Sequence, residues 1–184
     1  RLISSAASDV YKRQIADIGI IGLPNAGKSS LLASLTSATP KIANYKFTTI
    51  NPNLGVAIYD DKEITLADIP GLIEGAHKGT GLGIKFLKHI ERCKVLLHLI
   101  DISEKNLVNS YSQVREEMAK YSSELLKKQE IIVFNKTDLV DEEEKNKKIK
   151  EFHEIIKKPT FETSTLDKNC LLYTSPSPRD SLSS

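Results

Sequence analysis

Hydrophobic residues fall into short apolar runs that alternate with segments of helical spacing. The runs at 15–21, 95–101 and 131–134 are typical of buried strands. Two further strands at 53–59 and 63–68, joined by Asp60-Asp61, predict a hairpin, and 160–163 would be the last strand. Apolar positions three and four apart predict helices over 27–37, up to residue 92, over 141–158, and through Leu107, Tyr111, Val114, Met118, Tyr121 and Leu125.

This alternation predicts an α/β protein with a mostly parallel six-stranded sheet and helices on both faces. Binding sites in such sheets lie beyond the carboxyl ends of the strands. Two segments lack a clean period. Residues 38–52 contain Pro40 and Pro52 and read as a loop, whereas 68–83 is Gly-rich and is expected to be mobile.

Length and charge narrow the class of protein. At 184 residues the chain can build a proper core, and a net charge of +2 gives no basic field for sequence-specific nucleic-acid binding. Cys93 and Cys170 are too few and too far apart for a zinc site or disulfide framework, so a reducing cytoplasmic setting is expected. No apolar run has the length of a membrane span.

The two ends differ from the rest. Residues 1–14 and 170–184 lack periodicity and resemble translated linker sequence, so we expect them to be non-native or disordered. The segment 15–169 is then expected to form the domain.

The strongest motif is Gly-Leu-Pro-Asn-Ala-Gly-Lys-Ser at 22–29, which fits the G-x-x-x-x-G-K-[ST] phosphate-binding loop. Its glycines let backbone N–H groups turn toward phosphate, and the following helix aims its positive end there. Lys28 supplies a cation and Ser29 a hydroxyl for Mg²⁺. The pattern follows a buried strand and opens a helix, which makes the fold that of a P-loop nucleoside triphosphatase.

Asp68 ends a predicted strand and begins Asp-Ile-Pro-Gly. A hard divalent cation prefers oxygen ligands, so Ser29 and Thr49 are predicted as direct Mg²⁺ ligands and Asp68 as a ligand largely through water. Gly71 has no side chain and can bring its N–H close to a γ-phosphate. Thr48 and Thr49 also suggest a loop that senses the γ-phosphate and is released when it is lost.

Asn135-Lys136-Thr137-Asp138 follows a buried strand and is interpreted as a base reader. One carboxylate, Asp138, can accept both the ring N–H and the amino group of guanine, whereas adenine would present a bare acceptor to it. Sites built on such polar pairing reject the wrong partner strongly. Ser164 and Thr165 are candidates for donating backbone N–H groups to the guanine carbonyl.

Other reactive residues have structural interpretations. His77, His89 and His98 do not form a ligand set, and His98 is expected to be a hydrogen-bonded core residue. Cys93 is expected to be a small buried residue.

Together these segments resemble the GTPase domain of the bacterial Obg family. The resemblance rests on GLPNAGKSSLL, KIANYKFTTINPNLGV, ADIPGLIEGAHKGTGLGIKFLKHIERCKVLLHLID and NKTD, and covers about residues 15–166. It implies a GTP/GDP switch that associates with the large ribosomal subunit, through the full-length protein, and assists its assembly. Family members carry further domains on both sides, so the chain is expected to be a fragment.

The resemblance also bears on the reaction. Leu72 stands where Ras-like enzymes have a water-orienting Gln, so slow intrinsic hydrolysis is expected, with Lys28, Thr49 and Gly71 as the catalytic set. Asn25 matches the phosphate-loop Asn of K⁺-activated relatives, and K⁺ beside the phosphates is a hypothesis. The expected nucleotide-binding residues are Gly22, Leu23, Pro24, Asn25, Ala26, Gly27, Lys28, Ser29, Ser30, Phe47, Thr48, Thr49, Ile50, Asn51, Asp68, Ile69, Pro70, Gly71, Asn135, Lys136, Thr137, Asp138, Ser164, Thr165 and Leu166.

Two rival functions stay open at this point. One is an ATP-preferring relative with a similar phosphate loop, which Asp138 disfavours. The other is a nucleotide-gated binding module with negligible hydrolysis, which Leu72 makes credible. A small-molecule kinase is disfavoured because no lid with clustered Arg is visible.

Overall fold

The computed structural model describes residues 16–36, 41–42, 53–68, 91, 93–121 and 123–165. These residues form a sheet of order β2-β3-β4-β1-β5-β6-β7. The strands are β1 (Ala16–Ile21), β2 (Lys41–Ile42), β3 (Asn53–Tyr59), β4 (Lys62–Asp68), β5 (Cys93–Asp101), β6 (Gln129–Asn135) and β7 (Thr160–Glu162). Strands β4, β1, β5, β6 and β7 run parallel, and β3 pairs antiparallel with β2 and β4.

All six predicted strands are present, and the hairpin turns at Asp60-Asp61, whose φ values of 50° and 58° are both positive. Such left-handed pairs match the twist of antiparallel strands. The interpretation of 38–52 as loop throughout is wrong at β2. There, two extended residues pair with Asn53 and Leu54 of β3. They lie along the edge of β3 that faces away from β4.

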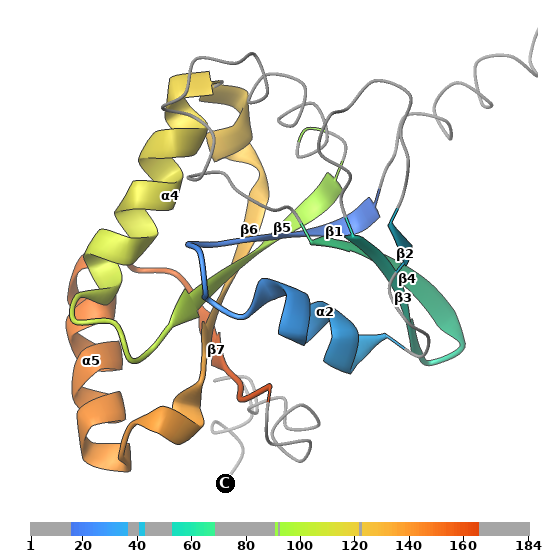
Figure 1. Ribbon diagram of the computed structural model, residues 1–184. Coiled ribbons are helices and arrows are strands. Elements are labelled where there is room, and N and C mark those ends of the chain that lie inside the picture. Colours follow the sequence, from blue (N-terminus) through green and yellow to red (C-terminus); the bar gives the residue numbers. More distant parts are fainter. Residues whose placement is uncertain are drawn as a thin grey trace, which may run out of the picture.

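Helices cover both faces of the sheet (Figure 1). Helix α2 (Lys28–Leu35) lies on one face, with Leu31 and Leu32 packed among Ile20, Leu66, Leu99 and Val133. Helices α4 (Leu107–Tyr121) and α5 (Glu142–Ile155) lie on the other. Because side chains alternate along a strand, Ile20 and Ile21 of β1 enter opposite core layers.

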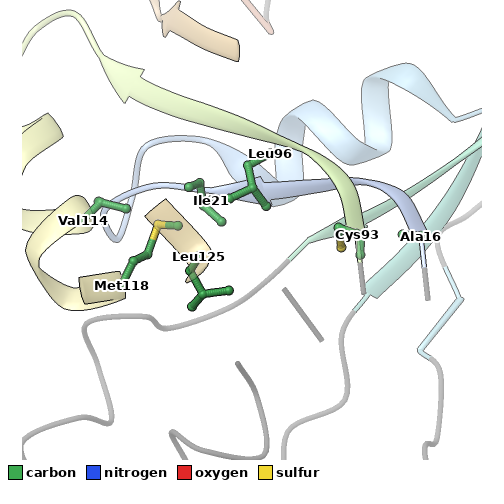
Figure 2. Close-up of a cluster of buried hydrophobic side chains, with 8 residues drawn as sticks. Ala16, Ile21, Cys93, Leu96, Val114, Met118 and Leu125 are labelled. Atoms are coloured by element: carbon green, nitrogen blue, oxygen red, sulfur yellow. The ribbon is translucent and has the colours of Figure 1, made fainter. Parts of the chain in front are cut away.

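The α4 side of the core is shown in Figure 2, where Met118 and Leu125 lie beside Ile21 and Leu96. Leu125 was expected in a continuing helix, but it lies in the 3₁₀ helix η2 (Ser123–Lys127). The tighter turn still returns its side chain to the core, where it is fully buried. The expected core place of Cys93 is confirmed, since only 2% of it is exposed.

Helix α5 begins and ends by local chemistry. Asp141 caps its N-terminus by accepting a hydrogen bond from Glu144 N at 2.8 Å. Acidic residues fill the first turn, where their negative charge interacts favourably with the positive end of the helix dipole. It ends at Ile155, before the predicted 158, because Ile156 is extended with φ −106° and ψ 96°, and Pro159 disfavours helical backbone at Lys158. The predicted helix ending near residue 92 lies outside the described residues, apart from helical Glu91.

A buried polar network lies between β5, β6 and α4. Glu130, with 1% of its side chain exposed, contacts His98 Nδ1 at 2.9 Å and Lys158 Nζ at 2.7 Å. The Tyr111 hydroxyl donates to Glu130 Oε2 at 3.1 Å, and Arg115 lies 3.5 Å from that oxygen. The expected hydrogen-bonded core position of His98 is thus confirmed.

Protonation in this network follows from burial and pairing. Burial holds the pKa of His98 below its ordinary value, because the charged ring would lose its water, so His98 is neutral near pH 7. Burial alone would raise the pKa of Glu130, but hydrogen bonds from His98 and Lys158 and the charge of Arg115 bring it to about 2.

In the described part of the chain, no helix is long and apolar enough to cross a membrane.

Candidate functional site: a nucleotide cavity between two loops

The phosphate loop connects β1 to α2 at the carboxyl edge of the sheet. Gly27 has φ +94°, and a Cβ on it would lie 2.3 Å from Asn135 Nδ2. A Cβ on Gly22 would lie 2.3 Å from the Leu99 carbonyl oxygen. Gly22 also has a positive φ, of +154°, so both positions require glycine for their backbone conformation and for the close approach of Leu99 and Asn135.

Lys28 folds back over this loop. Its Nζ donates to the carbonyl oxygens of Gly22 at 3.2 Å and Leu23 at 2.9 Å. The ammonium group is thus held at the mouth of the loop, where an anionic phosphate would meet it. Asn25 has φ 64° and belongs to the same turn.

Ser29 and Asp68 are brought together as predicted for a Mg²⁺ site. Parallel pairing sets Asp68 of β4 opposite Ile20 of β1, and Ser29 Oγ donates to Asp68 Oδ2 at 2.5 Å. Asp68 is 2% exposed, and its Oδ1 has no hydrogen-bond partner among the described residues. A buried carboxylate oxygen in that state is costly unless a cation or water pairs with it, so these oxygen donors fit a hard divalent ion.

The Asn135–Asp138 segment is tied to the phosphate loop. Asn135 is fully buried at the end of β6, and its Nδ2 donates to the Ala26 carbonyl at 2.9 Å. Lys136 takes a left-handed φ of 64°, and the 3₁₀ helix η3 (Thr137–Leu139) follows. The predicted base-reading segment and the phosphate loop are therefore fixed to one another by a buried side chain.

Residues after β7 support the same segment. Ser164 Oγ donates to Asp138 Oδ1 at 2.5 Å, and Thr137 Oγ1 donates to the Thr163 carbonyl at 3.2 Å. We predicted a backbone role for Ser164; its side chain has a separate one, orienting the carboxylate. In the sequence, this contact could have been predicted only by expecting the carboxyl ends of β6 and β7 to lie side by side.

A cavity of about 510 Å³ lies between these loops. Its lining comes from both motifs: Asn25, Gly27, Lys28, Ser29, Ser30, Lys136, Asp138, Leu139 and Thr165. The lining thus combines phosphate-loop residues with Asp138 and Lys136, the two sets of groups that a nucleoside phosphate requires. Such a volume is within the range of small-molecule sites.

The structure also shows a residue that sequence reasoning missed. Asp101, at the end of β5, contacts Lys136 Nζ at 2.5 Å. Burial by itself would raise the pKa of Asp101, but hydrogen bonds from Lys136 and Ser103 hold it below its ordinary value. Its position at the end of an apolar strand could have marked Asp101 as a candidate site residue, but its contact with Lys136 depends on the register of β5 and β6.

Several predicted site residues lie outside the described residues. They are Phe47, Thr48, Thr49, Ile50, Asn51, Ile69, Pro70, Gly71 and Leu166. Their roles stay predictions, as do the domain boundaries at 15 and 169.

A parallel sheet with this phosphate loop and base-reading segment defines the class of P-loop nucleotide-binding proteins. Solved structures agree on the fold. Era in complex with MgGDPNP and a segment of 16S ribosomal RNA has a TM-score of 0.64 and 26% identity, covering 82% of this chain and 51% of that one. The G domain of the T. maritima FeoB iron transporter has a TM-score of 0.56 and 23% identity, covering 81% and 87%.

The profile of the 50S ribosome-binding GTPase family matches residues 17–136, and the chain therefore belongs to that family. It is 66% identical over 159 residues to GTPase Obg of Pelagibacter ubique, covering 86% of this chain and 49% of that protein. GTPase Obg of Ehrlichia chaffeensis is 55% identical, with coverage of 83% and 45%. The resemblance drawn from the motifs is thus confirmed, and the chain spans about half the length of these relatives.

Proposed function

We propose that the chain binds GTP with Mg²⁺ and hydrolyses it to GDP and phosphate. The observation that carries this is the buried Asn135–Ala26 hydrogen bond of 2.9 Å, which ties the segment containing Asp138 to the phosphate loop, and both line one cavity. Similar proteins support the proposal, since the related Era structure contains MgGDPNP.

The chemistry assigned to each residue follows from charge. Phosphoryl transfer needs little covalent help, so positioning and neutralisation of the phosphate oxygens supply the catalysis. Lys28 and the loop N–H groups would bind these oxygens. Ser29 and Asp68, with Thr49, would hold Mg²⁺, which when bound neutralises charge on the phosphates. In this proposal Asn25 also contacts K⁺.

Base selection follows from Asp138. Its carboxylate accepts two donors on guanine, and Ser164 Oγ occupies one lone pair of Oδ1 and so fixes the direction of the group. Adenine offers no matching pair of donors at that edge, so its binding would cover the Asp138 carboxylate without replacing the hydrogen bonds that water gives it. GTP is therefore the proposed substrate and ATP the excluded one.

The likeness to GTPase Obg extends the proposal to the cell. We infer that the full-length protein acts in the cytoplasm as a switch in assembly of the large ribosomal subunit. The nucleotide state of this domain would be the signal that the ribosome contact reads.

The test measures phosphate release by the purified 184-residue chain with GTP and Mg²⁺. The matched variants are Lys28→Ala and Lys147→Ala, the latter an exposed lysine of α5. We expect release by the wild type and Lys147→Ala and a loss of at least about 100-fold in Lys28→Ala, as for removal of a main transition-state charge partner. Tight GTP binding with no release above the Lys28→Ala rate would instead support a binding module, and preference for ATP in competition would refute the guanine assignment.

A further inference from the structure

Asp101 is held rigidly at the end of β5. Its Oδ1 accepts hydrogen bonds from Ser103 N at 2.9 Å and Ser103 Oγ at 2.6 Å. Its carbonyl accepts from Glu104 N at 3.2 Å, closing a turn. The carboxylate therefore cannot rotate freely, and its second oxygen has a fixed direction.

That second oxygen anchors Lys136. Asp101 Oδ2 lies 2.5 Å from Lys136 Nζ, with 11% and 29% of the two side chains exposed. The two strands place the pair: Asp101 is in register with Asn135, the residue before Lys136. The left-handed backbone of Lys136 then directs its side chain back toward β5.

The anchored side chain lines the nucleotide cavity. Lys136 lines this cavity together with Asp138 and Leu139. A purine whose edge meets Asp138 needs a surface for its ring face, and the four methylenes of a fixed lysine provide one. A lysine side chain without such an anchor would lose rotamer entropy when the base binds. In the anchored side chain, that entropy is already lost before binding.

We propose that Asp101 is a positioning residue for base binding, acting through Lys136. The inference rests on the proposed guanine-nucleotide function of the cavity. It predicts that Asp101 contributes to the affinity for any purine nucleotide that Asp138 binds. It also predicts that Asp101 contributes nothing to the affinity for the phosphate groups.

The experiment is a double-mutant cycle on the 184-residue chain. Binding of a fluorescent GDP is measured for wild type, Asp101→Asn, Lys136→Met and the double variant. Tripolyphosphate, competed against the same probe, reports binding without a base. The cycle cancels the general effect of removing a negative charge, because that effect is present with and without Lys136.

Two controls separate anchoring from other effects. Glu104→Gln removes an exposed negative charge from the same turn but leaves the contact between Asp101 and Lys136 in place. Asp17→Asn removes the ion pair of 2.7 Å with Lys94, located at the start of β1 and so at the opposite edge of the sheet. If Asp101→Asn does not fold by circular dichroism, Asp101→Glu takes its place, since it keeps the charge and displaces the oxygen.

We expect Asp101→Asn to weaken GDP binding about 3- to 10-fold in the wild-type background and to have no effect in Lys136→Met. Tripolyphosphate binding and both controls should stay at wild-type values. An equal loss in both backgrounds, no loss, or a matching loss of tripolyphosphate binding would overturn the positioning role while leaving the proposed function intact. Failure of the wild-type chain to bind GDP would overturn both.

Discussion

Glu130 is the buried carboxylate whose removal tests the core electrostatics most sharply. Its pKa of about 2, against an ordinary value of 4.5, means that the folded state favours the charged form. Because the folded pKa is the lower one, this stabilisation is present above pH 4.5 and is lost as pH falls toward 2. At 1.36 kcal/mol for each unit, the contribution is about 3 kcal/mol near pH 7 and about 1 kcal/mol at pH 3.

Glu130→Gln keeps the shape of the side chain but removes its charge. Lys158 and Arg115 then lose the carboxylate that pairs with them, and the single amide oxygen can replace only one of the two oxygens that His98 and Tyr111 contact. We expect the free energy of unfolding to fall by about 3 kcal/mol at pH 7. For a domain of this size, this lowers the Tm by roughly 6–12 °C.

The assay is urea unfolding of wild type and variant at pH 7 and pH 3, followed by circular dichroism. The difference between the two proteins should shrink from about 3 to about 1 kcal/mol as the pH falls. Glu124→Gln is the matched control, because this glutamate pairs with Lys127 on an exposed surface with 69% of its side chain accessible. A Glu130→Gln difference that is the same at both pH values would refute the assignment of a depressed pKa.

Three shorter predictions concern the loop, the core and the thiol. Gly27→Ala, with φ +94° and a Cβ 2.3 Å from Asn135 Nδ2, should reduce GDP affinity at least about 10-fold in a fluorescence titration. Met118→Ala empties a fully buried position and should cost about 2–5 kcal/mol in urea unfolding; an effect below 1 kcal/mol would contradict the described packing. Burial raises the pKa of the Cys93 thiol to about 11, so tryptic mapping after iodoacetamide at pH 8 should find it unlabelled in the folded protein and labelled in urea.

The parts of the fold and site set by local pattern could be predicted from the sequence. The apolar run before Gly22 and the helical spacing after Lys28 located the phosphate loop, because the motif and both flanking elements are contiguous. The strand before Asn135 located the base reader in the same way. Cys93 and His98 were placed in the core because each lies within or beside a continuous apolar run.

The contacts that depend on register or on unusual backbone could not be predicted. Asp101 meets Lys136 only because β5 and β6 pair in one register and Lys136 adopts a left-handed φ. Ser164 meets Asp138 only because β7 returns beside β6. The break between α4 and η2 was missed because a 3₁₀ turn keeps the same buried stripe that a helix would.

The nucleotide preference of Asp138→Asn tests the central claim most directly. An Asn in this position offers one acceptor and one donor, with Ser164 still available to its oxygen. The amide N–H₂ of Asn would then face the exocyclic amino group of guanine, donor against donor. Xanthine has a carbonyl oxygen at that position and would accept a hydrogen bond from it. We predict that affinity for GDP falls about 100-fold and that affinity for XDP rises above the wild-type value. Unchanged GDP affinity in the folded variant would contradict the account, because Asp138 would then not be reading the base.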